Sequence, residues 1–239
     1  MNLVFVISVF LLVHILFDFY FQPSKWVEAK TSLGFKSKEL YLHCFAYAVA
    51  ISLVVLLLTR SCWLTVTSFF GVAIAHIITD GLKCKYSDNV AYFIADQIVH
   101  ILVLGVFVWL VYVRYTIVVE MIWIKVLLIA LGYMSILKPF GIVAKKIMDT
   151  FGFRPSENGL KKGGLWIGYI ERFLIFTFIL MSYYEGIGFL LTAKSIFRFG
   201  ELKNEKEIKR TEYILIGTLL SFGLAICIGI LTKAVLNNL

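Results

Sequence analysis

The chain has 239 residues, of which 60% are hydrophobic and 16% are charged, and its net charge is +8. Soluble domains contain about 45–50% apolar and about 25% charged residues, so this composition excludes an ordinary soluble enzyme and a disordered chain. The positive charge does not indicate a nucleic-acid partner, because an excess of Lys and Arg in a membrane protein commonly marks its cytoplasmic loops. The four cysteines follow no metal-ligand or disulfide spacing, so we expect them to be reduced.

Apolar segments recur along the whole chain and predict an all-α, polytopic integral membrane bundle. About eight segments have the composition of a transmembrane helix: 3–21, 40–59, 62–82, 90–113, 121–144, 165–184, 187–199 and 213–235. Segment 187–199 is the shortest, with a helical length of about 20 Å against a hydrocarbon core of about 30 Å. We divide the chain into two four-helix halves, 1–115 and 116–239.

Lys and Arg gather in alternate loops, which predicts the orientation. The basic loops are 22–39, 83–89, 145–164 and 200–212, whereas the intervening loops and the tail carry few basic residues. The positive-inside rule places the basic loops in the cytoplasm and both termini outside. About eight crossings satisfy this pattern, so we expect 187–199 to be a true span.

Histidine and aspartate are paired inside the first four segments. The pairs with a spacing of four are His14–Asp18, His76–Asp80 and Asp96–His100, and the remaining histidine, His43, opens the second segment. A spacing of four puts both side chains on one helix face. In the predicted orientation all of them lie toward the cytoplasmic side, in one layer. Ionisable residues inside a bilayer are costly and usually functional, so this layer is the candidate site.

The first two hairpins share a pattern, an HxxxD on the first helix and a histidine on the second. Helices 1–4 therefore resemble a duplicated hairpin, a parallel repeat about an axis along the membrane normal. Binding sites commonly lie at the interface of such repeats.

The predicted cofactor is a divalent metal. Imidazole and carboxylate ligands suit Zn²⁺ best, with Mn²⁺ or Fe as alternatives. The predicted ligands are His14, Asp18, His43, His76, Asp80, Asp96 and His100. They outnumber the ligands of one ion, so either two ions bind or some carboxylates orient the histidines. Two other interpretations stay open: the pairs are structural hydrogen-bonded couples, or the histidines bind haem.

The second half buries charge at the same predicted depth. Glu171 and Arg172 lie in GYIERF, Lys194 and Arg198 lie in AKSIFRF, and Lys138 precedes a proline. Cations suit a phosphate or carboxylate headgroup, so the predicted substrate-binding residues are Lys138, Arg172, Lys194 and Arg198. The alternative is that Lys194 and Arg198 snorkel to the interface and Glu171 neutralises a neighbouring cation.

These features predict a membrane-embedded, metal-dependent hydrolase that acts on a lipid-linked phosphate or related ester at the cytoplasmic leaflet. Asp96 and Glu171 are the candidate catalytic carboxylates. The alternative is a divalent-cation or proton transporter that uses the same His and Asp cluster. A scaffold with purely structural polar residues is a third interpretation. The expected partner is a membrane lipid or lipid-linked substrate, and a homo-oligomer stays open.

Several motifs resemble an uncharacterised bacterial inner-membrane family of unknown function. They are H-x-x-x-D-F-x-x-Q (His14, Asp18, Phe19, Gln22), the later His43, HIITD followed by Lys83, DQIVH, GYIERF and AKSIFRF…EYILIGTLLS, and they extend over nearly the whole chain. The resemblance implies location in the bacterial inner (plasma) membrane and supplies no mechanism.

A looser resemblance concerns the first hundred residues. His43 and HIITD are similar to the membrane-bound metal-dependent hydrolases of bacterial inner membranes, which carry a helix-borne H-x-x-x-D. The Pro-Asp-x-Asp-His element of those proteins has no counterpart in this chain.

Overall fold

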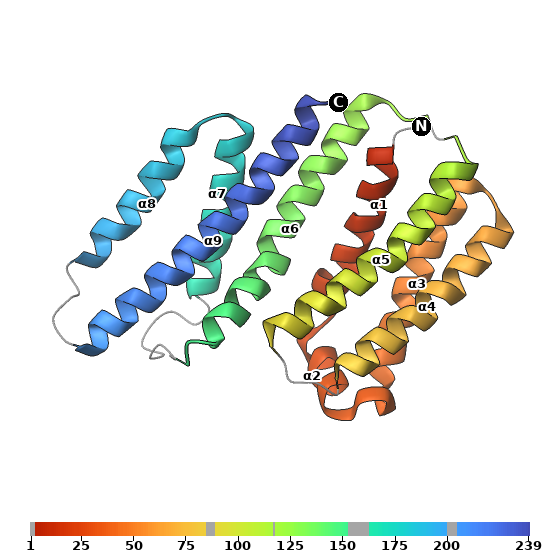
Figure 1. Ribbon diagram of the computed structural model, residues 1–239, viewed down its shortest axis with the longest axis horizontal. Coiled ribbons are helices and arrows are strands. Elements are labelled where there is room, and N and C mark those ends of the chain that lie inside the picture. The colour runs from red at the N-terminus through yellow and green to blue at the C-terminus, as the bar shows by residue number, and fades with distance from the viewer. Residues whose placement is uncertain (1–2, 85–88, 117, 153–162, 200–204) are drawn as a thin grey trace. The chain divides into compact units, whose positions relative to one another are not determined.

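The computed structural model describes residues 3–84, 89–116, 118–152, 163–199 and 205–239. Within these ranges the chain forms nine α-helices and two short helical segments, η1 and η2, and no strand (Figure 1). The predicted all-α class is therefore confirmed. The chain divides into two compact units, unit 1 (Met1–Leu127) and unit 2 (Leu128–Leu239).

Unit 1 contains the helices of the first four apolar segments and one helix that the segments did not predict. In chain order these are α1 (Leu3–Ile15), η1 (Leu16–Tyr20), α2 (Ser24–Leu33), η2 (Gly34–Lys36), α3 (Lys38–Thr59), α4 (Cys62–Lys83) and α5 (Val90–Arg114). The additional helix is α2, which occupies the basic loop between the first two spans. Gly34 ends α2 with a φ of 56°, a left-handed conformation that glycine adopts without a Cβ clash.

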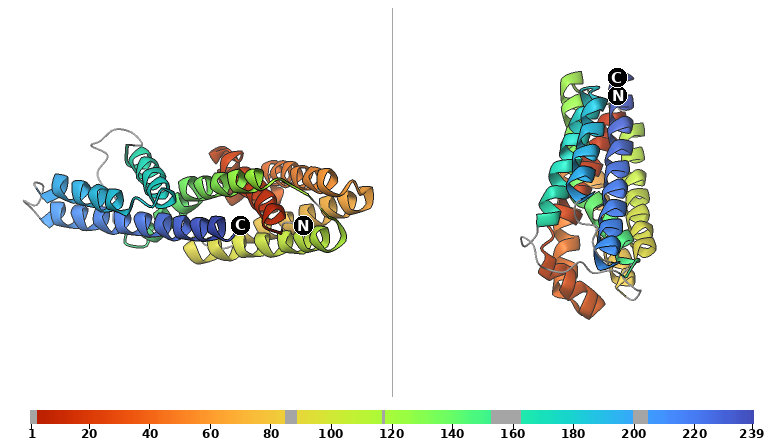
Figure 2. Two further views of the ribbon diagram at one scale, coloured as in Figure 1. Left: turned by 90° about the horizontal axis from the view of Figure 1, so that it is seen from above. Right: turned by 90° about the vertical axis from the view of Figure 1, so that its left-hand side faces the viewer.

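The spans of unit 1 pack through an apolar core that lies away from the polar residues. α3 and α4 form an antiparallel hairpin, and α1 and α5 pack beside them (Figures 1 and 2). The core includes Phe10, Ile51, Val55, Leu104 and Val111, all almost fully buried. The buried ionisable residues of the described spans in unit 1 lie toward the other end of these helices: the end of α1, the beginning of α3, the end of α4 and the first half of α5.

Unit 2 is also helical. α6 (Met121–Asp149) begins in unit 1 and continues into unit 2, where α7 (Gly163–Leu180), α8 (Tyr184–Phe199) and α9 (Glu205–Asn237) follow. Ile175 and Ile179 of α7 pack against Phe222 and Ala225 of α9. The Tyr133 hydroxyl of α6 bonds to the Thr177 hydroxyl of α7 at 2.8 Å.

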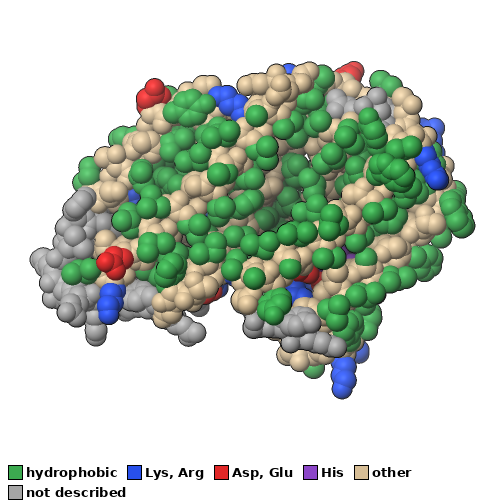
Figure 3. Space-filling model, in the orientation of Figure 1, with side chains coloured by type: hydrophobic (Ala, Val, Ile, Leu, Met, Phe, Trp, Pro, Cys, Tyr) green, Lys and Arg blue, Asp and Glu red, His purple; other side chains and the backbone are tan. Residues whose placement is uncertain are grey.

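Seven of the described helical segments are long and apolar enough to cross a membrane. They are Leu3–Tyr20, Lys38–Thr59, Cys62–Lys83, Val90–Arg114, Met121–Asp149, Gly163–Leu180 and Ile208–Asn237. Large apolar side chains stand on their outer surfaces, such as Leu57 (79% exposed) and Trp63 (75%), and Figure 3 shows hydrophobic side chains across one face. Continuous apolar surface of this kind suits lipid better than water, so the helices are compatible with an integral membrane protein.

The predicted eighth span lies in α8, which has 16 residues. A helix of that length measures about 24 Å, shorter than the hydrocarbon core of about 30 Å. The described residues therefore contain seven span-length helices where about eight were expected, and a full crossing by α8 stays a prediction.

Candidate metal centre

The structure brings all seven predicted ligands together at one end of unit 1. Neighbouring carboxylate and imidazole atoms of this cluster lie 3.3–3.8 Å apart. Six of the side chains belong to residues at most 7% exposed, and the Asp18 side chain is 9% exposed. The members are His14, Asp18, His43, His76, Asp80, Asp96 and His100. The spacing and the Lys and Arg counts predicted that these residues lie in one layer, and the fold does bring their side chains together.

Asp18 lies in the π-helical turn η1 at the end of the first span. The N–H of Phe21 donates to the carbonyl of Leu16, five residues earlier, at 2.8 Å, which is the π-helical bond. Turns of this kind are rare and often occur at functional sites. From this turn Asp18 reaches histidines of two other helices, His43 of α3 and His76 of α4.

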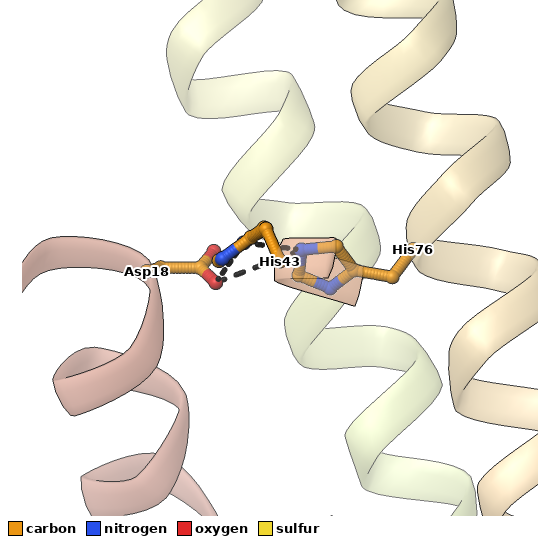
Figure 4. A group of neighbouring side chains, drawn as sticks. All are labelled: Asp18, His43 and His76. Carbon is orange, nitrogen blue, oxygen red and sulfur yellow. Dashed lines mark hydrogen bonds and ion pairs between the residues drawn. The ribbon is translucent and has the colours of Figure 1, made fainter. Parts of the chain in front are cut away.

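Asp18, His43 and His76 form what we call the Asp18 triad (Figure 4). Its three atoms make a nearly regular triangle: Asp18 Oδ1 to His43 Nε2 is 3.4 Å, His43 Nε2 to His76 Nε2 is 3.1 Å, and His76 Nε2 to Asp18 Oδ1 is 3.6 Å. Tetrahedral zinc with ligand bonds of about 2.0–2.1 Å requires ligand atoms about 3.3–3.4 Å apart. The triangle therefore has the size of three corners of a zinc tetrahedron.

Asp18 has histidine neighbours but no lysine or arginine partner among the described residues. Among the described residues Asp18 contacts the imidazoles of His14, His43 and His76, and no Lys or Arg pairs with it. Its Oδ1 is buried and accepts no well-formed hydrogen bond within that part of the chain. A buried carboxylate without compensation is costly, so the donor set fits a bound cation.

A second set, which we call the lysine-paired group, consists of Asp80, Asp96 and His100 with Lys30 and Lys83. His100 Nε2 lies 3.3 Å from Asp80 Oδ1 and 3.3 Å from Asp96 Oδ1. On the opposite carboxylate oxygens, Lys30 Nζ donates to Asp80 Oδ2, and Lys83 Nζ donates to Asp96 Oδ2 at 2.6 Å. Both carboxylates are thus neutralised by protein ammonium groups.

The two sets touch through histidine rings. His76 Nε2 lies 3.8 Å from Asp80 Oδ1, and the His76 and His100 rings stack with centroids 4.1 Å apart. His14 is held on both ring nitrogens, by the Tyr47 hydroxyl at 3.2 Å and by Gln97 Oε1 at 3.1 Å. These bonds fix the orientation of His14 beside Asp18, and its role as a metal ligand stays a prediction.

The sequence analysis did not predict that Lys30 belongs to the site. It treated this residue as one of the basic residues of loop 22–39. Lys30 is 8% exposed and lies on α2, fifty positions before its partner Asp80. Phe35 of the adjoining segment lies against Gly81, where an added Cβ would come within 2.1 Å of its ring. The absence of a side chain at Gly81 lets this segment approach the end of α4 and brings Lys30 to the site. No local pattern marks such a contact.

The cysteines of the site are thiols. Cys44 is buried and, with His76 and Asp80, forms a third set of atoms within 4.8 Å of one another, so the sequence analysis also missed a candidate sulfur ligand. Cys84, which follows α4, donates its S–H to the Asp80 carbonyl at 3.1 Å. Burial, and then the nearby Asp80 charge, raise the pKa of the Cys84 thiol, so it stays protonated at neutral pH.

The remaining predicted site residues lie in unit 2. Arg172 is buried and donates to the Ser221 hydroxyl at 2.9 Å and to the Leu137 carbonyl at 3.1 Å. Glu171 and Lys194 form an ion pair with an N–O distance of 2.7 Å. Lys138 lies on α6, and the side chain of Arg198 lies outside the described residues. The headgroup role of these cations and the catalytic role of Glu171 stay predictions.

The fold and this site describe a helical protein, compatible with a membrane location, that has a buried His and Asp cluster in unit 1. The chain belongs to the DUF3307 family, described as proteins of unknown function, through a match to residues 6–130. The expected membership in an uncharacterised family is therefore confirmed. The match ends at residue 130, whereas the resemblance was expected to cover nearly the whole chain, and it includes the entire cluster. No curated protein and no solved structure matches the chain.

Proposed function

We propose that the protein is a membrane-embedded metal-dependent hydrolase acting on a lipid-linked phosphate or related ester at the cytoplasmic leaflet. The observation that carries the proposal is the Asp18 triad, whose three atoms have the spacing of zinc ligands and whose carboxylate has no lysine or arginine partner among the described residues. Three protein ligands and an open fourth position are the usual arrangement of catalytic zinc. Zinc is the expected ion, and Mn²⁺ or Fe are alternatives.

In this proposal each member of the cluster has a distinct task. Asp18, His43 and His76 hold the ion. A bound zinc ion lowers the pKa of a coordinated water to about 7 and polarises the group to be hydrolysed. Asp80, 3.8 Å from the His76 ligand atom, is the carboxylate nearest to the triad outside it and is placed to accept a proton. Asp96 supports Asp80 indirectly, because His100 Nε2 lies 3.3 Å from an oxygen of each carboxylate.

We propose one bound ion, although the seven predicted ligands are numerous enough for two ions. Asp80 and Asp96 already pair with Lys30 and Lys83, and each ammonium supplies the positive charge that a second ion would bring. A second ion bound by Asp80, Asp96 and His100 would add positive charge to carboxylates that the two lysines already neutralise.

The proposed orientation follows the Lys and Arg counts. The site is placed at the cytoplasmic face of the bacterial inner membrane, both termini outside, with α8 as an eighth crossing and the first two hairpins as a duplication.

The transporter alternative is less well supported. A transport site needs access from both faces. The halves of α1, α3, α4 and α5 that lie away from the cluster, residues 3–13, 47–59, 62–75 and 101–113, contain no Asp, Glu, His, Lys or Arg. These halves therefore offer no ionisable side chain that could relay an ion. Ion flux into liposomes that is abolished by Asp80→Asn would overturn the preference for a hydrolase.

The first test is the metal content of protein purified without chelator, as the wild type, His76→Ala and His100→Gln. His76 is a triad member and His100 is the histidine stacked on it, so the second variant is a matched control. We expect about one zinc equivalent in the wild type and in His100→Gln, and its loss in His76→Ala. Equal metal content in all three proteins would contradict the proposed centre.

A further inference from the structure

The Lys30 ammonium group has N–H donors that no residue in the described part of the chain accepts. An ammonium group has three donors. Lys30 gives one to Asp80, and no other residue in the described part of the chain accepts from it. The side chain is nevertheless only 10% exposed. A buried ammonium with spare donors needs further acceptors, either from a ligand or from water.

Two more donors occur at the same end of unit 1. Gln22 follows η1, and its Nε2 is buried without a hydrogen-bond partner among the described residues. Lys83 ends α4 and gives one donor to Asp96, while 31% of its side chain faces outward. Gln22, Lys30 and Lys83 come from three separate segments, and each has donor capacity to spare. An incoming group that satisfies all three residues must be rich in acceptor oxygens.

We propose that Lys30, together with Gln22 and Lys83, binds the phosphate group of the substrate. A phosphate offers more acceptor oxygens than a carboxylate, and lysine is a common point-charge partner for it. Asp80 links Lys30 to the metal ligand His76. A phosphate held by Lys30 therefore lies one carboxylate away from the Asp18 triad. The inference rests on the proposed function and narrows its substrate from an ester in general to a phosphoester.

The position of α2 explains how such a substrate reaches Lys30. α2 lies between the spans ending at Tyr20 and beginning at Lys38, so it lies close to the membrane surface. Phe21 and Leu33, at 59% and 55% exposed, flank it with apolar surface suited to the headgroup region. A phosphate could arrive at this place from a lipid headgroup or from solution.

Calorimetric titration of the full chain in detergent tests the inference. The probes are inorganic phosphate and, separately, dioctanoyl phosphatidic acid, each added to zinc-loaded and to zinc-free protein. We expect Lys30→Gln to weaken phosphate binding about 10–100-fold, the range for losing a hydrogen bond to a charged group. Lys25→Gln, an exposed lysine on the same helix, is the matched control and should bind as the wild type does.

A second variant protects the test against misfolding. Lys30→Gln leaves Asp80 without its cation, whereas Lys30→Gln combined with Asp80→Asn removes both charges and keeps a hydrogen-bonding pair. Both variants should lose phosphate binding. Binding of phosphatidic acid alone assigns the phosphate to a lipid, and binding of both probes admits a free phosphate. No binding of either probe, or unchanged affinity in both variants, would overturn the inference.

Zinc content measured on the same samples separates the two proposals. Lys30-dependent phosphate binding in protein that takes up no zinc would contradict the metal centre and leave the phosphate site standing. Zinc uptake without phosphate binding would contradict the phosphate site and leave the metal centre standing.

Discussion

The Asp18 triad and the lysine-paired group each contain an aspartate–histidine contact of nearly equal length, but their carboxylates differ in charge compensation. In each, an aspartate near the end of one helix meets a histidine near the beginning of the next span. Asp18 Oδ1 lies 3.4 Å from His43 Nε2, and Asp80 Oδ1 lies 3.3 Å from His100 Nε2. The HxxxD pairs have similar His–Asp distances but meet through different atoms, His14 Nδ1 with Asp18 Oδ2 at 3.7 Å and His76 Nε2 with Asp80 Oδ1 at 3.8 Å. The duplicated hairpin stays a prediction.

The two sets differ in the lysines that lie near their aspartates. Lys83 stands three positions after Asp80, whereas Phe21 stands three positions after Asp18. Lys30 adds a second ammonium on the side of Asp80. The lysine-paired group therefore carries its own positive charge, and Asp18 has none among the described residues. In the proposed function, the set without a lysine is the one that holds the metal ion.

The largest expected effect comes from removing the cation of Asp80. Lys30→Met leaves a buried carboxylate unpaired, which typically costs about 3–5 kcal/mol of unfolding free energy. Denaturation of the purified protein in mild detergent measures it. Lys25→Met on the same helix should change stability by less than about 0.5 kcal/mol. Equal stability of the two variants would show that the Lys30–Asp80 pair is not a structural contact.

Zinc removal should act only through the Asp18 triad. A ligand at a hundred times its dissociation constant adds about 2.7 kcal/mol of stability. We expect the wild type to unfold at lower temperature after chelation and to recover when zinc is added back. Asp18→Ala should show neither change. A zinc-dependent melting temperature in Asp18→Ala would place the ion elsewhere, with the Cys44, His76 and Asp80 set as the next candidate.

Lys83→Met should have a smaller effect than Lys30→Met. The Lys83 side chain is 31% exposed, against 10% for Lys30, so water can replace part of its contact with Asp96. We expect a loss of about 1 kcal/mol of unfolding free energy. The same denaturation experiment ranks the two lysines, and a reversed order would contradict the burial difference.

The change in stability caused by Asp→Asn should have opposite signs in the two sets, which makes this comparison the sharpest. In zinc-free protein Asp18→Asn removes an uncompensated buried charge, so stability should rise by about 1 kcal/mol. Asp80→Asn removes one half of an ion pair and should lower stability. Unfolding free energies of both variants in chelator test this, and a destabilising Asp18→Asn would mean that Asp18 is already compensated without metal.

Much of this site was predictable from composition and spacing. Apolar segment 62–82 becomes α4 (Cys62–Lys83), and 90–113 becomes α5 (Val90–Arg114), because lipid-length apolar runs leave few alternatives to a helix. The spacing of four then places His76 with Asp80, and Asp96 with His100. The distribution of Lys and Arg among the loops predicted the orientation of the helices, and with it a common depth for the His and Asp residues.

Lys30 and α2 were not predictable in the same way. A ten-residue helix rich in charged residues has no transmembrane signature, and the partner of Lys30 is fifty positions away. The length of α9 was missed for a related reason. It begins at Glu205, before the apolar segment starts, because apolar composition marks the lipid-exposed part of a helix and not the end of its hydrogen bonding.

X-ray absorption at the zinc edge tests the Asp18 triad most directly. In purified wild-type protein we expect two imidazole nitrogens and a carboxylate oxygen at about 2.0–2.2 Å. Asp18→Ala should lose the bound zinc, and Asp80→Asn should keep the same spectrum. A sulfur neighbour at about 2.3 Å, or zinc retained unchanged in Asp18→Ala, would contradict a centre built on Asp18, His43 and His76.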